Sequence, residues 1–123
     1  MNHIAVYVAD LSKSVQFYQH IVGLDTMANP FNDGKHAWLT VSEHAQLHLI
    51  SGSKAGEEHN KNSHLCFSVT SMDDFIAQLK ANHVSYENWI GESNAVTKRA
   101  DGVIQIYFKD PDGYWIEINN DKF

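Results

Sequence analysis

The chain repeats one hydrophobic pattern, and this repeat most restricts the folds that it can adopt. When residue 64 is laid over residue 3, apolar residues coincide at successive positions although few of them are identical. The matched pairs are Ile4 and Leu65, Val6 and Phe67, Val8 and Val69, Leu11 and Met72, and Val15 and Ile76. Because hydrophobic periodicity is the main sequence signal of secondary structure, the two halves are predicted to fold alike.

Each copy begins with a strand and continues into a helix. Residues 3–8 alternate between branched apolar side chains and other side chains, as a strand with one buried face does. Asp10 or Ser12 can cap the first helix, and Gly23 ends it. Ser71 is followed three positions later by an acidic residue, so it predicts the start of the second helix in the manner of a capping box.

Three more strands are expected after each helix. Their ranges are 24–28, 35–41 and 45–50 in the first copy, and 84–90, 103–109 and 114–119 in the second. Trp38 and Trp89 fall in strands of equivalent position. The last two strands flank a turn in which Pro111 presets φ and Gly113 accepts a positive φ, which predicts a hairpin. The order βαβββ, found twice, predicts an α+β fold with a curved mixed sheet.

The whole chain is expected to form one domain, residues 1–123. We expect module 1 at residues 1–52, a linker at 53–62 and module 2 at 63–123, because the middle stretch is rich in Gly, Ser, Lys and Glu. With 123 residues, of which 43% are hydrophobic, the chain is long enough to bury one core.

Four residues of the predicted strands stand out as candidate metal ligands: His3, His48, His64 and Glu117. Each lies on the parity opposite the apolar residues of its strand, so each points away from the packing face. Imidazole nitrogens and a carboxylate suit zinc, nickel, cobalt, manganese or ferrous iron, whereas an all-oxygen set would indicate calcium or magnesium. Each copy supplies two ligands. Two copies side by side, within one chain or between two, would form a cleft with a metal at its floor.

Composition excludes several classes of partner. The net charge of −6 and the nine Lys and Arg residues leave no basic face for nucleic acid. No apolar stretch approaches the ~20 residues of a membrane span, and the start has no secretion signal, so a cytoplasmic location is expected. The single cysteine, Cys66, cannot form an intrachain disulfide, which fits a reducing compartment. Because it lies in an apolar strand, we expect it to be a small buried hydrophobe.

Several motifs together resemble the vicinal oxygen chelate superfamily, which includes glyoxalase I, extradiol dioxygenases, fosfomycin-inactivating enzymes and bleomycin-resistance proteins. The resemblance is carried by residues 3–11, by Ser14, Phe17, Tyr18, Gly23 and Leu24, by residues 64–69, and by residues 107–117. It implies the glyoxalase/bleomycin resistance/dioxygenase fold and a homodimer in which modules from two subunits complete each metal site. By position, His3, His64 and Glu117 match the shared metal ligands, and His48 matches a fourth ligand that glyoxalase I adds, usually Glu.

The resemblance to glyoxalase I implies a metal-dependent lyase or isomerase that acts on a small molecule. Its substrate would be a thiol adduct of an α-oxoaldehyde or a similar oxygen-chelating compound, isomerised through an ene-diolate that the metal stabilises. Zinc, nickel or cobalt is the expected metal, with manganese and iron as alternatives. Glu117 is the expected base, and His48 a ligand or second proton-transfer group. Tyr7 and Trp115 share the parity of the ligands in their strands, so we expect an aromatic wall at the substrate site.

Three other functions fit the same resemblance. A fosfomycin- or phosphonate-modifying transferase would use Lys98, Arg99 and Tyr107 for its anionic substrate. An extradiol dioxygenase would bind ferrous iron through the three ligands other than His48. A drug-binding protein of the bleomycin-resistance kind would hold its ligand without metal, and such proteins typically lack these four ligands.

Overall fold

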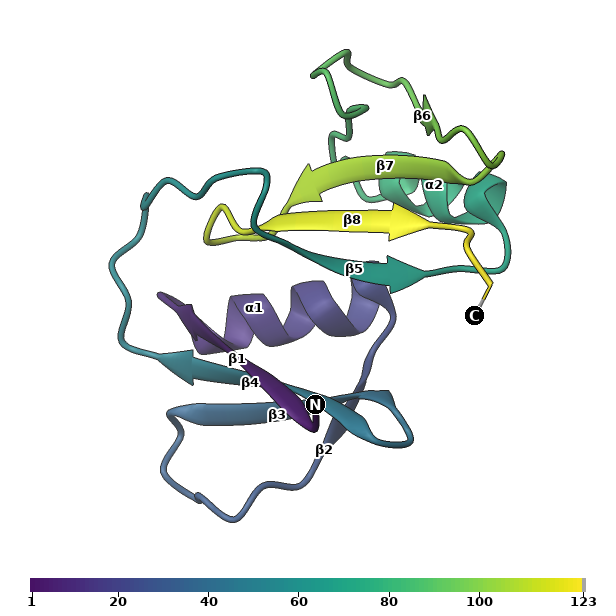
Figure 1. The fold of residues 1–123 in the computed structure, drawn as a ribbon. Coiled ribbons are helices and arrows are strands. Elements are labelled where there is room, and N and C mark those ends of the chain that lie inside the picture. The colour runs from purple at the N-terminus through teal and green to yellow at the C-terminus, as the bar shows by residue number, and fades with distance from the viewer. Residues whose placement is uncertain (123) are drawn as a thin grey trace. The chain divides into compact units, whose positions relative to one another are not determined.

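The computed structural model describes residues 1–122 and divides into two compact units, Met1–Glu57 and Glu58–Phe123. Each unit carries its own four-stranded sheet and a helix that follows the first strand (Figure 1). The two units repeat one order of strands around a helix that follows the first strand.

The first unit is a mixed sheet with one parallel pair. Its strands are β1 (His3–Val8), β2 (Asp25–Met27), β3 (His36–Ser42) and β4 (Ala45–Ser51). They lie in the order β1-β4-β3-β2, with β1 parallel to β4 and the other neighbours antiparallel. Helix α1 (Leu11–Phe17) contacts β3 and β4. It begins the crossover that a parallel pair requires.

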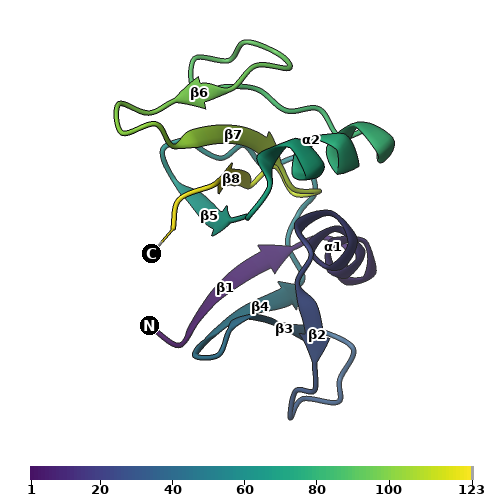
Figure 2. The same ribbon diagram turned by 90° about the vertical axis from the view of Figure 1, so that its right-hand side faces the viewer.

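The second unit has the same topology. Its elements are β5 (His64–Ser68), α2 (Met72–Ala81), β6 (Thr97–Lys98), β7 (Ile104–Lys109) and β8 (Trp115–Asn119). The strand order is β5-β8-β7-β6, with β5 parallel to β8. Helix α2 lies alongside β7 and β8 (Figure 2), where the rings of Phe75 and Phe108 are 6.0 Å apart. The predicted α+β architecture is confirmed.

Both helices begin at the expected caps, and one of them ends differently. The Asp10 carboxylate accepts from the Lys13 amide at 3.1 Å, so Asp10 is the cap and Ser12 lies inside the helix. After Phe17 the first helix widens into a π-helical turn, η1 (Tyr18–Val22), which ends at Gly23 with φ +92°. Within the described residues, no helix has the length and apolar character to span a membrane.

The predicted strand at residues 84–90 is wrong. In the structure only Glu87 forms isolated bridges there, to Ser93 and Tyr107, and the edge position is taken by the short strand β6. The chain folds back on itself instead, because the Gly91 amide donates to Asn88 O at 3.1 Å and Gly91 adopts φ +92°. The equivalence of Trp89 with Trp38 is therefore wrong as well, since Trp89 lies outside the strands.

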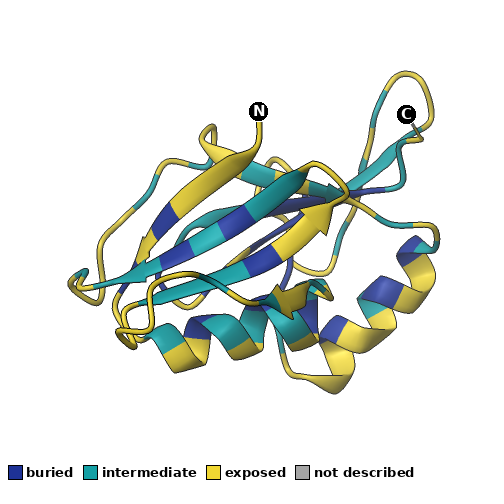
Figure 3. Ribbon diagram, turned by 90° about the horizontal axis from the view of Figure 1, so that it is seen from below, coloured by how far each residue is buried: buried dark blue, intermediate teal, exposed yellow. Residues whose placement is uncertain are grey.

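The strands separate a packed face from a polar face, as their alternation predicts. Leu47, Leu49, Ile116 and Ile118 are all at most 2% exposed, and buried positions form regular bands along the strands (Figure 3). The expectation that Cys66 is buried is wrong, because Cys66 is exposed. It lies an even number of residues from His64 and therefore on the polar face of β5.

Candidate functional site

The two units hold their candidate ligands at the same register. In the first unit Ala5 of β1 pairs with His48 of β4, and His3 lies two residues before Ala5. In the second unit Cys66 of β5 pairs with Glu117 of β8, and His64 lies two residues before Cys66. Since side chains two apart share a face, each unit presents two adjacent ligand side chains from neighbouring parallel strands. The structure thus brings together one pair in each unit.

The second unit holds an imidazole and a carboxylate close enough for one metal ion to bridge, although the described residues form no group of three or more such ligands. His64 Nδ1 lies 2.9 Å from Lys61 O, so Nδ1–H donates and Nε2 keeps its lone pair. That Nε2 is 3.9 Å from Glu117 Oε2. Metal bonds of about 2.0–2.2 Å can span two donors at this separation. A histidine whose other nitrogen is bound to a carbonyl is also the usual arrangement of a ligand.

The other carboxylate oxygen of Glu117 is held by neighbouring donors. Tyr107 Oη donates to Glu117 Oε1 at 2.6 Å and Gln105 Nε2 donates at 2.5 Å. Burial, and then the hydrogen bond to Glu117, raises the pKa of Tyr107 above its usual value. Cys66 is exposed as a residue, but partial desolvation of its sulfur, and then the hydrogen bond to Glu117, raises its pKa to about 12. Both groups remain protonated donors at neutral pH. Glu117 is therefore fixed through Oε1 and presents Oε2 toward His64.

In the first unit the two histidines stack. The rings of His3 and His48 are 4.2 Å apart at 13°, and the Trp38 ring covers the other face of His48 at 4.1 Å and 2°. His48 Nε2 lies 2.8 Å from Gln46 Oε1, which leaves the lone pair on Nδ1. Burial, and then the charges of His3 and His36, lowers the pKa of His48. The ring is therefore neutral at pH 7, as a metal ligand must be.

A pocket of about 490 Å³ opens beside these histidines within the first unit. It is lined by Asn2, His3, Phe31, Trp38, Glu43, His44, Gln46 and His48. Phe31 is 48% exposed and meets Trp38 edge to face, with the ring centres 6.1 Å apart. The pocket thus combines an aromatic wall with nitrogen donors. No lysine or arginine is among the described residues that line it.

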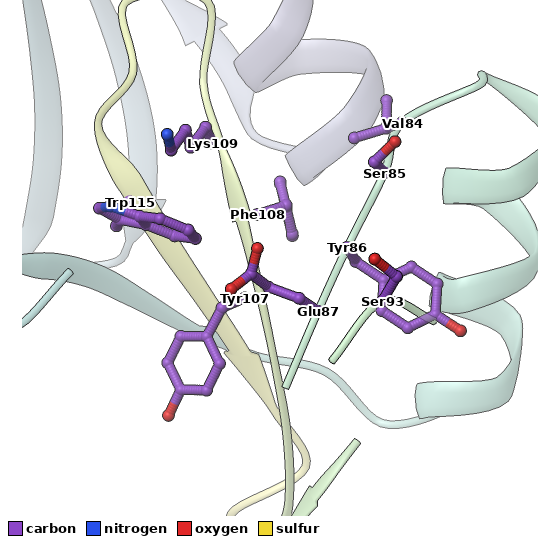
Figure 4. A pocket seen from close by; sticks show the side chains of 9 residues that line it. All are labelled: Val84, Ser85, Tyr86, Glu87, Ser93, Tyr107, Phe108, Lys109 and Trp115. Carbon is purple, nitrogen blue, oxygen red and sulfur yellow. The ribbon is translucent and has the colours of Figure 1, made fainter. Parts of the chain in front are cut away.

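The second unit has a pocket of about 370 Å³ between β7, β8 and the segment that follows α2 (Figure 4). Its lining includes Tyr107 and Trp115, two of the four residues predicted to bind substrate. Lys109 also lines it, with its ammonium 4.9 Å from the centre of the Trp115 ring.

The remaining two predicted substrate residues have different environments. Tyr7 is 52% exposed at the end of β1, where a Cβ on Gly52 would lie 2.8 Å from its hydroxyl oxygen. Arg99 binds Asp101 through Nε at 2.9 Å and Asp121 through Nη2 at 2.8 Å. Its charge is therefore balanced by two carboxylates, and a phosphonate would have to compete with both.

Two residues that hold the His64–Glu117 pair of the second unit were not predicted from the sequence: Gln105 and Lys61. Gln105 shares strand parity with Tyr107, and this parity could have placed it beside Glu117. Lys61 falls in the polar stretch that we expected to be a linker, where no periodic pattern marks it. The structure shows that it binds both His64 and the segment at residues 87–89.

Comparisons with known proteins agree with this architecture. Residues 1–118 match the family model described as Glyoxalase/Bleomycin resistance protein/Dioxygenase superfamily. "Glyoxylase I 4" of Arabidopsis thaliana is 27% identical over 127 residues, which span 98% of this chain and 70% of that protein. Metallothiol transferase FosB of Staphylococcus epidermidis is 27% identical over 125 residues, spanning 97% and 80%.

A solved structure shows the same fold. The fosfomycin resistance protein FosX of Listeria monocytogenes superposes with a TM-score of 0.76 at 21% identity, covering 100% of this chain and 93% of that one. The family match over nearly the whole sequence and the twin βαβββ units lead to one conclusion: the chain belongs to the glyoxalase/bleomycin resistance protein/dioxygenase superfamily.

Proposed function

We propose that this protein is a divalent-metal-dependent lyase of the glyoxalase I type that isomerises a small oxygen-chelating substrate. The proposed ligands are His3 and His48 from the first unit and His64 and Glu117 from the second, combined within one chain or between two copies of it. The observation that carries the proposal is the shared register: both units place two ligand side chains at equivalent positions of their parallel strand pairs. A fold repeat alone does not require donor side chains at both places.

In the proposed reaction, different side chains transfer the proton and exclude water from the substrate. A bound divalent metal would hold two adjacent substrate oxygens and stabilise the negative charge of the ene-diolate. Glu117 Oε2 would act as the base after it is released from the metal, while Tyr107 and Gln105 keep the carboxylate in place through Oε1. One proton leaves the hydroxyl-bearing carbon and returns to the carbonyl carbon, and the hydroxyl proton passes to the former carbonyl oxygen, so the net reaction is an isomerisation. The aromatic wall of Phe31 and Trp38 would exclude water from an apolar part of the substrate.

The first experiment is elemental mass spectrometry on tag-free protein purified without chelator. We expect about one zinc, nickel or cobalt ion per chain. The metal-loaded protein is then assayed with methylglyoxal and several thiols, of which glutathione is one. Protein that neither contains nor takes up metal would refute the proposal and favour a metal-free binding protein.

Variants then test the ligands. Glu117→Gln and His64→Ala are expected to lower the metal content and abolish the isomerisation. His83→Asn is the matched control, because His83 is an exposed histidine at φ +56°, a conformation that Asn tolerates. Equal loss of metal in the control would show that the effect of the ligand variants is not specific.

A second candidate is a thiol transferase of the fosfomycin-modifying type. The observation that favours it is the sandwich of His48 between His3 and Trp38, in which His48 packs as an aromatic ring. His3, His64 and Glu117 would then suffice to bind the metal without His48. In this case His48→Ala keeps its metal, and the protein adds a thiol to the epoxide of fosfomycin. If the protein is instead a lyase of the glyoxalase I type, His48→Ala loses metal affinity.

A further inference from the structure

The ammonium group of Lys61 donates three hydrogen bonds within the second unit. Its Nζ donates to Glu87 Oε2 at 2.7 Å, to Asn88 O at 2.9 Å and to Trp89 O at 3.0 Å. The side chain is only 17% exposed. An ammonium has three donors, so this set satisfies it completely. The contacts join two segments that are 26 to 28 residues apart in the sequence.

Three aromatic rings surround the same ammonium. Lys61 Nζ lies 5.5 Å from the ring centre of Trp89, 5.1 Å from that of Tyr107 and 4.8 Å from that of Trp115. All three distances are within the range of a cation–π contact. We call these three rings, together with Glu87, the ammonium cage. Figure 4 labels Glu87, Tyr107 and Trp115 of this cage, which line the same pocket of the second unit.

The cage is connected to both candidate ligands of the second unit. The backbone carbonyl of Lys61 accepts from His64 Nδ1 at 2.9 Å, and the cage residue Tyr107 donates to Glu117 at 2.6 Å. The His64 ring also meets Tyr107 and Trp89 edge to face, with ring centres 5.9 and 6.4 Å apart. One residue thus links the orientation of His64 to the position of the segment at 87–89.

We propose that Lys61 is a positioning residue: its ammonium is a built-in ligand of the cage, and by filling it Lys61 holds residues 87–89 in place and fixes the orientation of His64. The effect on metal affinity rests on the function proposed above. The effects on the cage and on the His64 ring do not, because they are properties of the metal-free protein.

The central variant is Lys61→Met, which keeps an unbranched side chain and removes the three donors and the charge. In metal-free protein labelled with 5-fluorotryptophan, we expect the ¹⁹F signal of Trp89 to shift and broaden. The ring ¹⁵N shifts of His64 should change from a single tautomer, with the proton on Nδ1, to a mixture. Metal affinity should fall about 10-fold, at the lower end for loss of a ligand's supporting contact because the carbonyl itself remains.

Lys109→Met is the matched control. Its ammonium lies 4.9 Å from the same Trp115 ring, yet Lys109 is exposed. The Lys109→Met variant therefore removes the charge beside the Trp115 ring and keeps the three hydrogen bonds between Lys61 and residues 87–89. We expect the Trp89 signal, the His64 tautomer and the metal affinity to stay as in the parent protein.

Chemical rescue separates positioning from general destabilisation. Lys61→Ala removes the side chain beyond Cβ, and propylammonium supplies the missing three carbons and the ammonium. Millimolar propylammonium should restore the Trp89 signal and the His64 tautomer, whereas sodium chloride at equal ionic strength should not. If Lys61→Ala does not fold, Lys61→Met and Lys61→Arg carry the test, with the arginine variant expected to retain more of the order.

Two results would overturn the proposal. One is a Lys61→Met protein whose Trp89 signal and His64 tautomer match the parent. The other is a folded Lys61→Ala protein that is altered but indifferent to propylammonium. A parent protein without metal affinity would refute the proposed function alone, because the fluorine and nitrogen signals would still decide the role of Lys61.

Discussion

Glu117 uses its two carboxylate oxygens for different purposes. Oε1 accepts from Tyr107 and Gln105, while Oε2 faces His64 across 3.9 Å. A carboxylate held through one oxygen loses little further freedom when the other binds a metal or a proton. Tyr107 was predicted from the sequence to bind substrate, and in the structure its hydroxyl donates a hydrogen bond to the Glu117 carboxylate.

The variant Tyr107→Phe tests this role of the hydroxyl. It keeps the ring that faces Lys61 and His64 and removes only the donor to Glu117. We expect metal affinity to fall by about 10-fold, as for other supporting contacts of metal ligands. Competition with a chelating dye measures this affinity. Tyr86→Phe, at a second buried tyrosine that lines the same pocket, should leave it unchanged.

The ion pair between Arg99 and Asp101 leads to a prediction about how stability depends on pH. The hydrogen bond from Arg99 lowers the pKa of Asp101 from 3.8 to about 2. Because the folded pKa is the lower one, the stabilisation from this pair is complete above about pH 4 and is lost as the pH falls through about 2. A carboxyl ¹³C titration should show this midpoint, and Arg99→Met should return it toward 3.8. A normal midpoint in the parent protein would mean that Arg99 does not hold Asp101, so that only Asp121 would compete with an anionic substrate for Arg99.

At the scale of elements, strand parity was the most reliable guide. It predicted that the four candidate ligands lie away from the packed face, and the buried residues Leu47, Leu49, Ile116 and Ile118 confirm the packed side. The same parity places Cys66 on the face of His64, whereas the apolar residues around Cys66 in its strand predict that it is buried. Alternation along a strand fixes a side chain's face, whereas a composition tendency does not.

The elements that escaped prediction are those set by distant contacts. Residues 84–90 have strand-like composition, yet their neighbours Lys61 and Tyr107 come from elsewhere in the sequence. Lys61 itself looks like any lysine of a polar stretch. Such features depend on tertiary contacts that a local pattern does not contain.

The contact between β1 and the end of β4 gives an element-scale prediction. Gly52 has φ +127°, and a Cβ there would lie 2.8 Å from the Tyr7 hydroxyl. Gly52→Ala should therefore cost roughly 1–3 kcal/mol, from backbone strain together with displacement of Tyr7. Gly34→Ala is the control, since Gly34 has φ +70° and nothing within 4 Å of an added Cβ. It should cost about 1 kcal/mol, and urea unfolding of both variants measures the difference.

At the scale of the whole molecule, the two units are repeats that differ in their donors. The first contributes two imidazoles and an aromatic pocket, and the second contributes an imidazole and a firmly held carboxylate. Neither pair alone supplies the three or four protein ligands usual for a zinc-type site. The proposed function therefore requires that one unit of each kind complete a site.

Complementation between two inactive variants tests how the site is completed. The superfamily resemblance implies sites shared between the subunits of a dimer, so His3→Ala and Glu117→Gln should rescue each other when they are unfolded and refolded together. A mixed dimer then has one site with both substitutions and one intact site. At equal amounts half of the dimers are mixed, so about one quarter of the parent's sites, and of its activity, should return. Each variant refolded alone is the control and should stay inactive. If the mixture also stays inactive while light scattering shows dimers, each site is completed within one chain, because every chain then carries a defect in its own site.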